Sequence, residues 1–578
     1  MPQGRRKIAF SGKKKKEQLA AKRQAKATHP NHYLLNKTLK DEESDDQAAR
    51  RGQPLEVQKL NFQPGKLGAD GRVNRYVFHF YRESDKQIKE AKEFAKKELC
   101  PVPPEGLEVG DNFFLGYDFP QRPPWNFEMS KEKLEWNENK YFRDYMQNLE
   151  KVHYDERKIL SYCELNLETW RQLWRVLELS DIVLLIADIR FPTLMFPPSL
   201  YQYVNQELRK SMILILNKID LVPPAIVLAW KKYFEEKYPS LHILTFTSFP
   251  SYNLRGPQGS STGIQIRRRR GKMRMAAEGA HEVYKAVSDI VKSTVDISSW
   301  ERKILEELNL SDGDDEEDEP ETPEIVHEEE KDLDFQTYVP HKNGILTIGC
   351  VGFPNVGKSS LMNALMGRKV VSVSRTPGHT KHFQTIFLTQ NVRLCDCPGL
   401  VFPSATPRSL QVLMGSYPIA QLREPYGAIR YLCERVDLVS LLSLKHDYHD
   451  PEYGWSPITV CDEWAVKRGF LTAKVARPAT YRSANSLLRM ALDGKFSFHL
   501  LPPDYIKNEA IWLDHPELKD IIAIQSKDPK LSEISFVNFT DSEDENEESS
   551  DDEEEEKQNS PAIPTTSNVF SVLNAEGI

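Results

Sequence analysis

One octapeptide constrains this chain more than any other feature. Residues 352–359 read Gly-Phe-Pro-Asn-Val-Gly-Lys-Ser, after an apolar run at Ile345–Val351 and before a helical pattern at Ser359–Met366. A glycine-rich loop in that position aims its backbone N–H groups, and the positive end of the helix, at one point. Lys358 can then reach the β- and γ-phosphates of a nucleotide, and the Ser359 hydroxyl can hold Mg²⁺. A strand–helix turn without a ligand is the alternative. The predicted phosphate contacts are Gly352, Phe353, Pro354, Asn355, Val356, Gly357, Lys358 and Ser359.

A second motif ends the predicted strand pair that follows. Gln384–Leu388 and Val392–Asp396 read as two paired strands, and the second runs into Asp-Cys-Pro-Gly. In phosphate-loop proteins an acidic residue at this strand end binds Mg²⁺, usually through water, and the next glycine can donate its N–H to the γ-phosphate. The tetrapeptide alone is also an ordinary turn, but its place after the phosphate loop favours the metal-side function. The predicted contacts are Asp396, Cys397, Pro398, Gly399 and Leu400.

Between these two motifs lies a polar loop, Ser374–Thr380, which contains a Pro-Gly pair. Such a loop can swing over a nucleotide and supply a hydroxyl to Mg²⁺ when the γ-phosphate is present. Thr376 and Thr380 are both candidates, and Thr380 is preferred; a plain surface loop is the alternative. The predicted metal set is therefore Ser359, Thr380 and Asp396.

The motif that selects a base lies earlier in the chain, in the Asn-Lys-Ile-Asp sequence at 217–220. The Asp220 carboxylate can accept hydrogen bonds from N1–H and the 2-amino group of guanine, a donor pair that adenine lacks. The aliphatic stem of Lys218 can lie along the ring. The next apolar run, His242–Phe246, ends in a Thr-Ser pair that can offer a backbone N–H to the guanine O6. The predicted base contacts are Asn217, Lys218, Ile219, Asp220, Thr247 and Ser248.

The apolar runs indicate the fold class. Ile182–Ala187, Met212–Leu216 and His242–Phe246 show no alternation and are joined by helical patterns such as Ala225–Lys237. Strands of this kind are buried on both faces of a parallel sheet. Together with the strand before the phosphate loop and the strand pair after it, they predict an α/β domain with a six-stranded, mostly parallel sheet.

Composition divides the rest of the chain. We expect a disordered basic arm at 1–60, a helical and Pro-rich region at 61–160, the α/β domain at 161–405 with a loop at 250–275 and an acidic linker at 311–342, a helical domain at 406–515, and an acidic disordered tail at 516–578. The N-terminus has no apolar stretch of a secretory signal, and the apolar runs are too short to span a membrane. Seven scattered cysteines indicate reduced thiols, in the cytosol or the nucleus.

The net charge of −8 hides strong segregation of charge. Lys13–Lys16 and Arg267–Arg274 are basic, whereas Asp312–Glu319 and Asp541–Glu556 are acidic. The basic clusters could contact RNA phosphates, serve as nuclear-import signals or be solvated loops. The acidic tracts could shield the basic arms or engage basic proteins. Two serines, at 549 and 550, precede acidic residues and have the pattern of phosphorylation sites.

The complete motif set resembles the circularly permuted GTPases of the YlqF/YawG type. Ordinary GTPases carry the phosphate loop first and the Asn-Lys-x-Asp motif later, and a closed sheet tolerates the inverse order when the original termini lie close together. The motifs that carry the resemblance are Asp188–Arg190, Asn217–Asp220, Thr247-Ser248, Gly352–Ser359, Thr376–Thr380 and Asp396–Gly399. The resemblance implies GTP and GDP as ligands, Mg²⁺ as cofactor and slow hydrolysis. It also implies a monomer of the nucleus, nucleolus and cytoplasm that serves ribosome subunit assembly by contacting ribosomal RNA or ribosomal proteins.

One residue departs from the ordinary GTPase pattern. Leu400 stands where Ras has the glutamine that orients the attacking water, so we expect slow intrinsic hydrolysis. Asn355 is similar to the asparagine of potassium-stimulated GTPases, which implies K⁺ as a second cation. The expected catalytic residues are Lys358, Asn355 and Thr380. Two other functions stay open: a GTP-sensing module with negligible hydrolysis, and an RNA-binding scaffold in which the nucleotide is structural.

Overall fold

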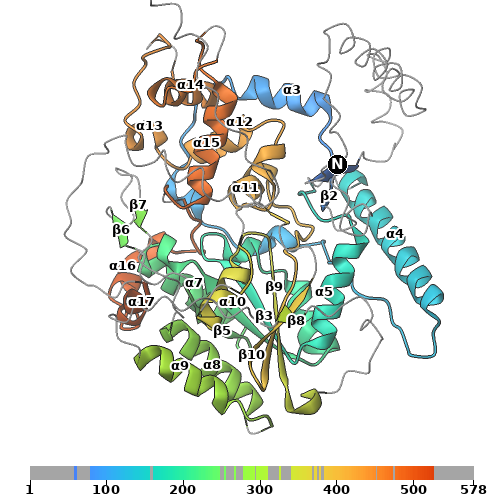
Figure 1. Ribbon diagram of the computed structural model, residues 1–578. Coiled ribbons are helices and arrows are strands. Elements are labelled where there is room, and N and C mark those ends of the chain that lie inside the picture. Colours follow the sequence, from blue (N-terminus) through green and yellow to red (C-terminus); the bar gives the residue numbers. More distant parts are fainter. Residues whose placement is uncertain are drawn as a thin grey trace, which may run out of the picture.

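The structure is a computed structural model of the whole chain (Figure 1). It describes residues 57–60, 78–155, 160–247, 253–255, 266–268, 277–292, 294–309, 325–326, 340–367, 370–373, 377–378, 383–450, 452, 454–472, 476–496 and 498–525. Several predicted features lie outside these residues: Ser248, Thr376, Thr380, the basic cluster at 13–16, the acidic tracts at 312–319 and 541–556, and Ser549 and Ser550.

The centre of the fold is a seven-stranded sheet with the strand order β5-β4-β3-β9-β11-β10-β8. Its strands are β3 (Ile182–Asp188), β4 (Ser211–Asn217), β5 (His242–Thr245), β8 (Ile325–Val326), β9 (Leu346–Gly352), β10 (Gln384–Thr389) and β11 (Val392–Asp396). The first five strands in the spatial order are parallel, and β10 and β8 continue the sheet in antiparallel pairing. The prediction of a six-stranded, mostly parallel sheet is confirmed, and the two-residue β8 extends its edge.

The strand order brings together two parts of the chain that are far apart in sequence. Strand β3 lies between β4 and β9, with Ile186 opposite Ile215 on one side and Gly352 on the other. Parallel strands end at the same edge of a sheet, and ligands bind at that edge. The motifs that follow β3, β4, β9 and β11 therefore meet there, whatever their order in the chain.

Helices cover the sheet, and α5 (Leu167–Leu179) shows how their sequence produces them. Its first turn is capped by Asn166, whose side chain accepts from the Glu168 N–H, and Trp170 and Trp174 form part of its buried face. Apolar residues that recur three and four positions apart predict such a buried face on a helix. The other helices around the sheet are α6 (Pro198–Gln202), α7 (Pro224–Lys237), α8 (Ala277–Val291), α9 (Ser298–Asn309) and α10 (Lys358–Met366).

A second group of helices packs at the carboxyl edge of the sheet (Figure 1). It consists of α3 (Asp85–Phe94), α11 (Arg408–Leu413), α12 (Tyr426–Cys433), α13 (Leu438–Leu441), α14 (Pro457–Lys467) and α15 (Thr480–Leu492). Helix α12 contacts α3, α11, α14 and α15. The remaining elements are β1 (Val57–Leu60), β2 (Phe78–Tyr81), β6 (Asn253–Arg255), β7 (Ile266–Arg268), α4 (Lys131–Asp155), α16 (Glu509–Leu513) and α17 (Leu518–Gln525).

The hydrophobic core runs from the sheet into this helical group without interruption. An aromatic cluster marks the junction: the Phe402 ring lies 5.4 Å from Trp170, 5.5 Å from Phe353 and 6.0 Å from Phe119, centroid to centroid. These rings come from α5, the phosphate loop, the segment after Asp396 and the N-terminal region. Among the described residues, no helix has both the length and the apolar character needed to cross a bilayer.

Candidate nucleotide-binding site

The phosphate loop, residues 352–359, takes the strand–loop–helix form that the sequence predicts: β9 ends at Gly352 and α10 begins at Lys358. Gly357 has φ +99°, and a Cβ there would lie 2.4 Å from the Asn217 Nδ2, so only glycine fits. The Lys358 ammonium donates to the carbonyls of Gly352 at 3.1 Å and Phe353 at 2.7 Å. Burial lowers the pKa of this lysine, although the nearby Asp396 charge acts in the opposite direction. A nucleotide phosphate would offset the cost of burying that charge.

The metal side of the site consists of two side chains in contact. The Ser359 hydroxyl donates to Oδ2 of Asp396 at 3.1 Å. The other carboxylate oxygen, Oδ1, is buried and has no hydrogen-bond partner among the described residues. Burial raises the pKa of Asp396 to about 6, against the charge of Lys358 and the Ser359 hydrogen bond. A buried carboxylate oxygen without a partner, next to a serine hydroxyl, fits a hard divalent cation such as Mg²⁺.

Gly399 and Leu400 pack directly against the phosphate loop. A Cβ on Gly399 would lie 2.7 Å from the Pro354 Cα, so this position requires glycine. The Leu400 N–H donates to the Gly352 carbonyl at 3.2 Å, and the Leu400 side chain is completely buried. A side chain that packs in the core cannot orient a water molecule in the site.

The segment after Gly399 is held by the N-terminal part of the chain, which no sequence pattern indicated. The Glu164 N–H donates to the Val401 carbonyl at 3.0 Å, and the Ser161 N–H donates to the Ser404 carbonyl at 3.0 Å. Burial raises the pKa of Glu164 to about 8, although its hydrogen bonds from the backbone of His79 and Asn166 oppose the change. Residues 160–166 therefore pair with the segment that, in P-loop proteins, responds to the γ-phosphate.

On the base side, Asn217 and Asp220 are buried at the end of β4. The Asn217 amide nitrogen donates to the Val356 carbonyl at 2.8 Å, which joins the base motif directly to the phosphate loop. The Asp220 carboxylate accepts from the Thr247 hydroxyl at 2.9 Å. Ile219 lies between them and is fully buried. The structure thus brings together the base and phosphate motifs that the chain carries in inverted order.

Lys218 connects three motifs. It has the left-handed φ of 62°, and its ammonium donates to Asp188 Oδ2 at 2.8 Å and to the Asn355 carbonyl at 2.5 Å. Asp188 is paired with Arg190 through two hydrogen bonds of 3.0 and 2.8 Å. Burial alone would raise the pKa of Asp188, but the charges of Arg190 and Lys218 outweigh it and lower the pKa well below its usual range. Asp188–Arg190 is thus an anchor for the lysine of the base motif.

Asn355, the expected potassium ligand, contacts the helical group. Its amide nitrogen donates to the Gly415 carbonyl at 2.9 Å, just beyond α11. Arg190 makes a similar link, because its guanidinium donates to the Ala491 carbonyl at the end of α15 at 3.0 Å. No sequence pattern indicated either partner. Both sides of the candidate site are therefore in direct contact with the helices that follow it.

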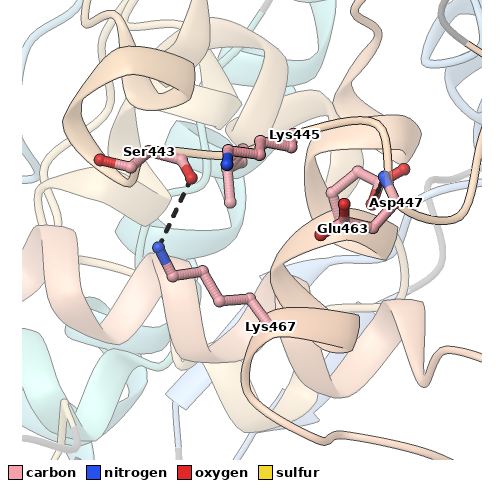
Figure 2. Close-up of a pocket in the computed structure, with 6 residues that line it drawn as sticks. Ser443, Lys445, Asp447, Glu463 and Lys467 are labelled. Carbon is pink, nitrogen blue, oxygen red and sulfur yellow. Dashed lines mark hydrogen bonds between the residues drawn. The ribbon is translucent and has the colours of Figure 1, made fainter.

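A separate cavity of about 340 Å³ lies between α14 and the segment that follows α13, away from these motifs (Figure 2). The Lys467 ammonium donates to the Ser443 carbonyl at 3.5 Å across it, and the Glu463 carboxylate accepts from the N–H groups of Asp447, Tyr448 and His449. Its polar groups serve the fold, and no motif residue lines it.

Comparison with known proteins gives the following similarities. The family described as 50S ribosome-binding GTPase matches residues 347–441, which include the phosphate loop and Asp396 but not the base motif. Guanine nucleotide-binding protein-like 1 of Homo sapiens is 46% identical over 546 residues, covering 90% of each chain. The mouse protein of the same name is 46% identical over 548 residues, again covering 90% of each.

More distant similarities also occur. Large subunit GTPase 1 of Schizosaccharomyces pombe is 34% identical over 400 residues, covering 67% of this chain and 58% of the yeast protein. The crystal structure of GNP-bound YlqF from T. maritima covers 58% of this chain and 99% of its own, with 17% identity and a TM-score of 0.32. That last likeness is too weak to support an argument about function.

Proposed function

Since the chain belongs to the family of guanine nucleotide-binding protein-like 1 and is a P-loop GTPase, we propose that it is a GTP-dependent switch with slow hydrolysis. One observation supports this most strongly. The Asn217 amide bonds to the Val356 carbonyl at 2.8 Å, and Lys218 bonds to the Asn355 carbonyl at 2.5 Å. The proposed base motif and the phosphate loop are therefore joined to each other by direct hydrogen bonds, as a single nucleotide site requires.

Each group of residues has a proposed role. Asp220 accepts the N1–H and 2-amino protons of guanine, Lys218 covers the ring, and Thr247 holds the Asp220 carboxylate. The phosphate loop N–H groups and Lys358 bind the β- and γ-phosphates, and the Gly399 N–H binds the γ-phosphate. Ser359 and Asp396, the latter through water, would hold Mg²⁺ together with Thr380. The ion would supply positive charge on the phosphate oxygens.

Slow hydrolysis is proposed because the chain lacks a water-orienting side chain after Gly399. Leu400 is packed in the core, so the attacking water must be oriented by another group. We propose K⁺ as a second cation, with Asn355 as a ligand and catalytic residue on the strength of the family resemblance. The alternative role of the Asn355 side chain is structural, because its amide donates to the Gly415 carbonyl.

The experiment that tests the guanine assignment is the Asp220→Asn substitution. An amide can donate to the C2 carbonyl of xanthine, but it cannot accept both guanine protons. We expect fluorescence titrations to show weaker GTP binding and a preference shifted toward xanthosine triphosphate. Asp144→Asn, at an exposed position on α4, is a matched control. Unchanged GTP affinity in Asp220→Asn would show that residues 217–220 do not read the base.

A GTP-sensing module with negligible hydrolysis is a second candidate, and the complete burial of Leu400 favours it. Single-turnover hydrolysis separates the two. If the hydrolysis rate in KCl with an added partner equals the rate of GTP hydrolysis in buffer without protein, the sensing module is favoured. Measurable turnover of bound GTP would favour the switch with hydrolysis.

We propose the large ribosomal subunit, through its RNA or proteins, as the site of action. The support is the description of the matching family and the name of the yeast relative. We also propose that the protein acts as a monomer in the nucleus or nucleolus and in the cytoplasm. Its domains would have the limits that the sequence predicts. Co-sedimentation with large subunits in GTP but not in GDP is the expected result. Salt-dependent RNA binding that is indifferent to the nucleotide would favour an RNA-binding scaffold instead.

A further inference from the structure

The last described helix of the chain lies against the base side of the site. Helix α17 (Leu518–Gln525) packs on α7, the helix that follows the base motif (Figure 1). Just before α17, the Glu517 carboxylate accepts from Lys232 at 2.6 Å and from Lys231 at 3.2 Å, both on α7. Gln525, at the end of α17, is buried with 5% of its surface exposed. A polar side chain this deeply buried needs hydrogen-bond partners.

The Gln525 amide finds those partners in the turn that carries Asp220. Its Nε2 donates to the Ile219 carbonyl at 2.6 Å and to the Val222 carbonyl at 2.9 Å. Both partners are backbone carbonyls, which can only accept, so the nitrogen of the amide must face them. The two protons of one side-chain NH₂ group therefore bridge the carbonyls on either side of Asp220.

This bridge adds to the short-range hydrogen bonds of the turn that carries Asp220. The turn is a single 3₁₀ segment, Ile219–Leu221, entered through the left-handed Lys218. The Ile219 N–H reaches the Phe246 carbonyl only at 3.4 Å. Within the turn, the Leu221 N–H donates to the Lys218 carbonyl at 2.9 Å and the Val222 N–H donates to the Ile219 carbonyl at 3.3 Å. Without Gln525, the Val222 carbonyl would lose its side-chain donor and the Ile219 carbonyl would keep the longer bond from Val222, so the turn would be held less firmly. A tilt of the turn moves the Asp220 carboxylate relative to the purine edge.

We propose that Gln525 is a positioning residue for guanine selectivity: it fixes the 219–222 turn so that both Asp220 oxygens meet the N1–H and 2-amino groups of the base. This inference rests on the proposed guanine site. Helix α17, some 300 residues away in sequence from the turn, would therefore contribute to base recognition through Gln525.

Comparison of GTP with inosine triphosphate tests the proposal. Inosine lacks the 2-amino group, so it can make only one of the two hydrogen bonds to Asp220. A hydrogen bond to a charged group corresponds to roughly ten- to hundredfold in affinity, and wild type should prefer GTP by such a factor. Gln525→Met keeps the length and apolar packing of the side chain but removes both donors. We expect it to lower the GTP-to-inosine triphosphate preference at least about threefold, with most of the loss in GTP affinity.

Two further variants keep the result interpretable. Glu517→Gln weakens the docking of α17 on α7 but leaves the bridge, and it should keep the wild-type preference. Gln525→Glu places a carboxylate oxygen against the two carbonyls and should reduce the preference at least as much as Gln525→Met. Melting curves show whether each variant is folded before titration.

The proposal is overturned if folded Gln525→Met and Gln525→Glu keep the wild-type preference, whatever their absolute affinities. It is also overturned if neither variant folds, since Gln525 would then serve the stability of the fold. A wild-type protein that binds ATP as tightly as GTP would instead refute the guanine site itself, independently of Gln525.

Discussion

Glu164 offers a prediction that links protonation to the docking of the N-terminal region. Its side chain is fully buried, and its Oε1 accepts from the backbone N–H groups of His79 at 3.0 Å and Asn166 at 2.8 Å. Oε2 is buried and has no partner among the described residues. Burial raises the pKa of the carboxyl from 4.5 to about 8. We therefore expect this group to be protonated in the folded protein at neutral pH.

The sign and size of the effect follow from linkage. The folded protein keeps the Glu164 proton up to about pH 8, whereas the unfolded chain releases it near 4.5. The folded state thus binds more protons between these values, and stability falls as the pH rises through them. At about 1.4 kcal/mol per pH unit, the full loss is about 5 kcal/mol. Glu164→Gln replaces the protonated acid with a neutral group of the same shape and should abolish this loss.

The assay is urea unfolding of the full chain from pH 5 to pH 9. At pH 5 the two proteins should agree within about 1 kcal/mol, and at pH 9 the glutamine variant should be the more stable by several kcal/mol. Glu168→Gln on the nearby α5 is the control, because its carboxylate is partly exposed and it should follow wild type. Parallel stability curves for wild type and Glu164→Gln across this range would refute the reasoning.

Two further outcomes are expected. Asp188→Asn should lower the free energy of unfolding by about 3 kcal/mol, because it leaves the buried Arg190 without its counter-charge. It should also weaken GTP binding, because it releases Lys218. A variant as stable as wild type in denaturant titrations would show that the Asp188–Arg190 pair contributes nothing to stability. Single-turnover hydrolysis should be no faster than about 10⁻⁴ s⁻¹ in NaCl and faster in KCl at equal ionic strength, and the difference should vanish in Asn355→Ala. Equal rates in both salts would refute the potassium proposal.

The sequence by itself determined the local chemistry and the elements that present it. The octapeptide at 352–359 requires its glycines because of backbone conformation, and the unbroken apolar runs can only be strands with both faces covered. Strand β11 was predicted with its exact limits, and the sheet edge followed because parallel strands end together. Each of these inferences depends on residues within one short window, where local sterics and hydrophobic burial act.

Tertiary structure alone decided which distant groups hold the site together. The contacts of Asn217 with Val356, of Glu164 with Val401 and of Gln525 with Ile219 join residues 139, 237 and 306 positions apart. No local pattern encodes them, because a backbone carbonyl has the same appearance in every sequence. Only the packing of the whole chain determines which carbonyl is buried next to which donor. The motifs therefore specify what the site can bind, and long-range hydrogen bonds to backbone carbonyls specify where each motif is held.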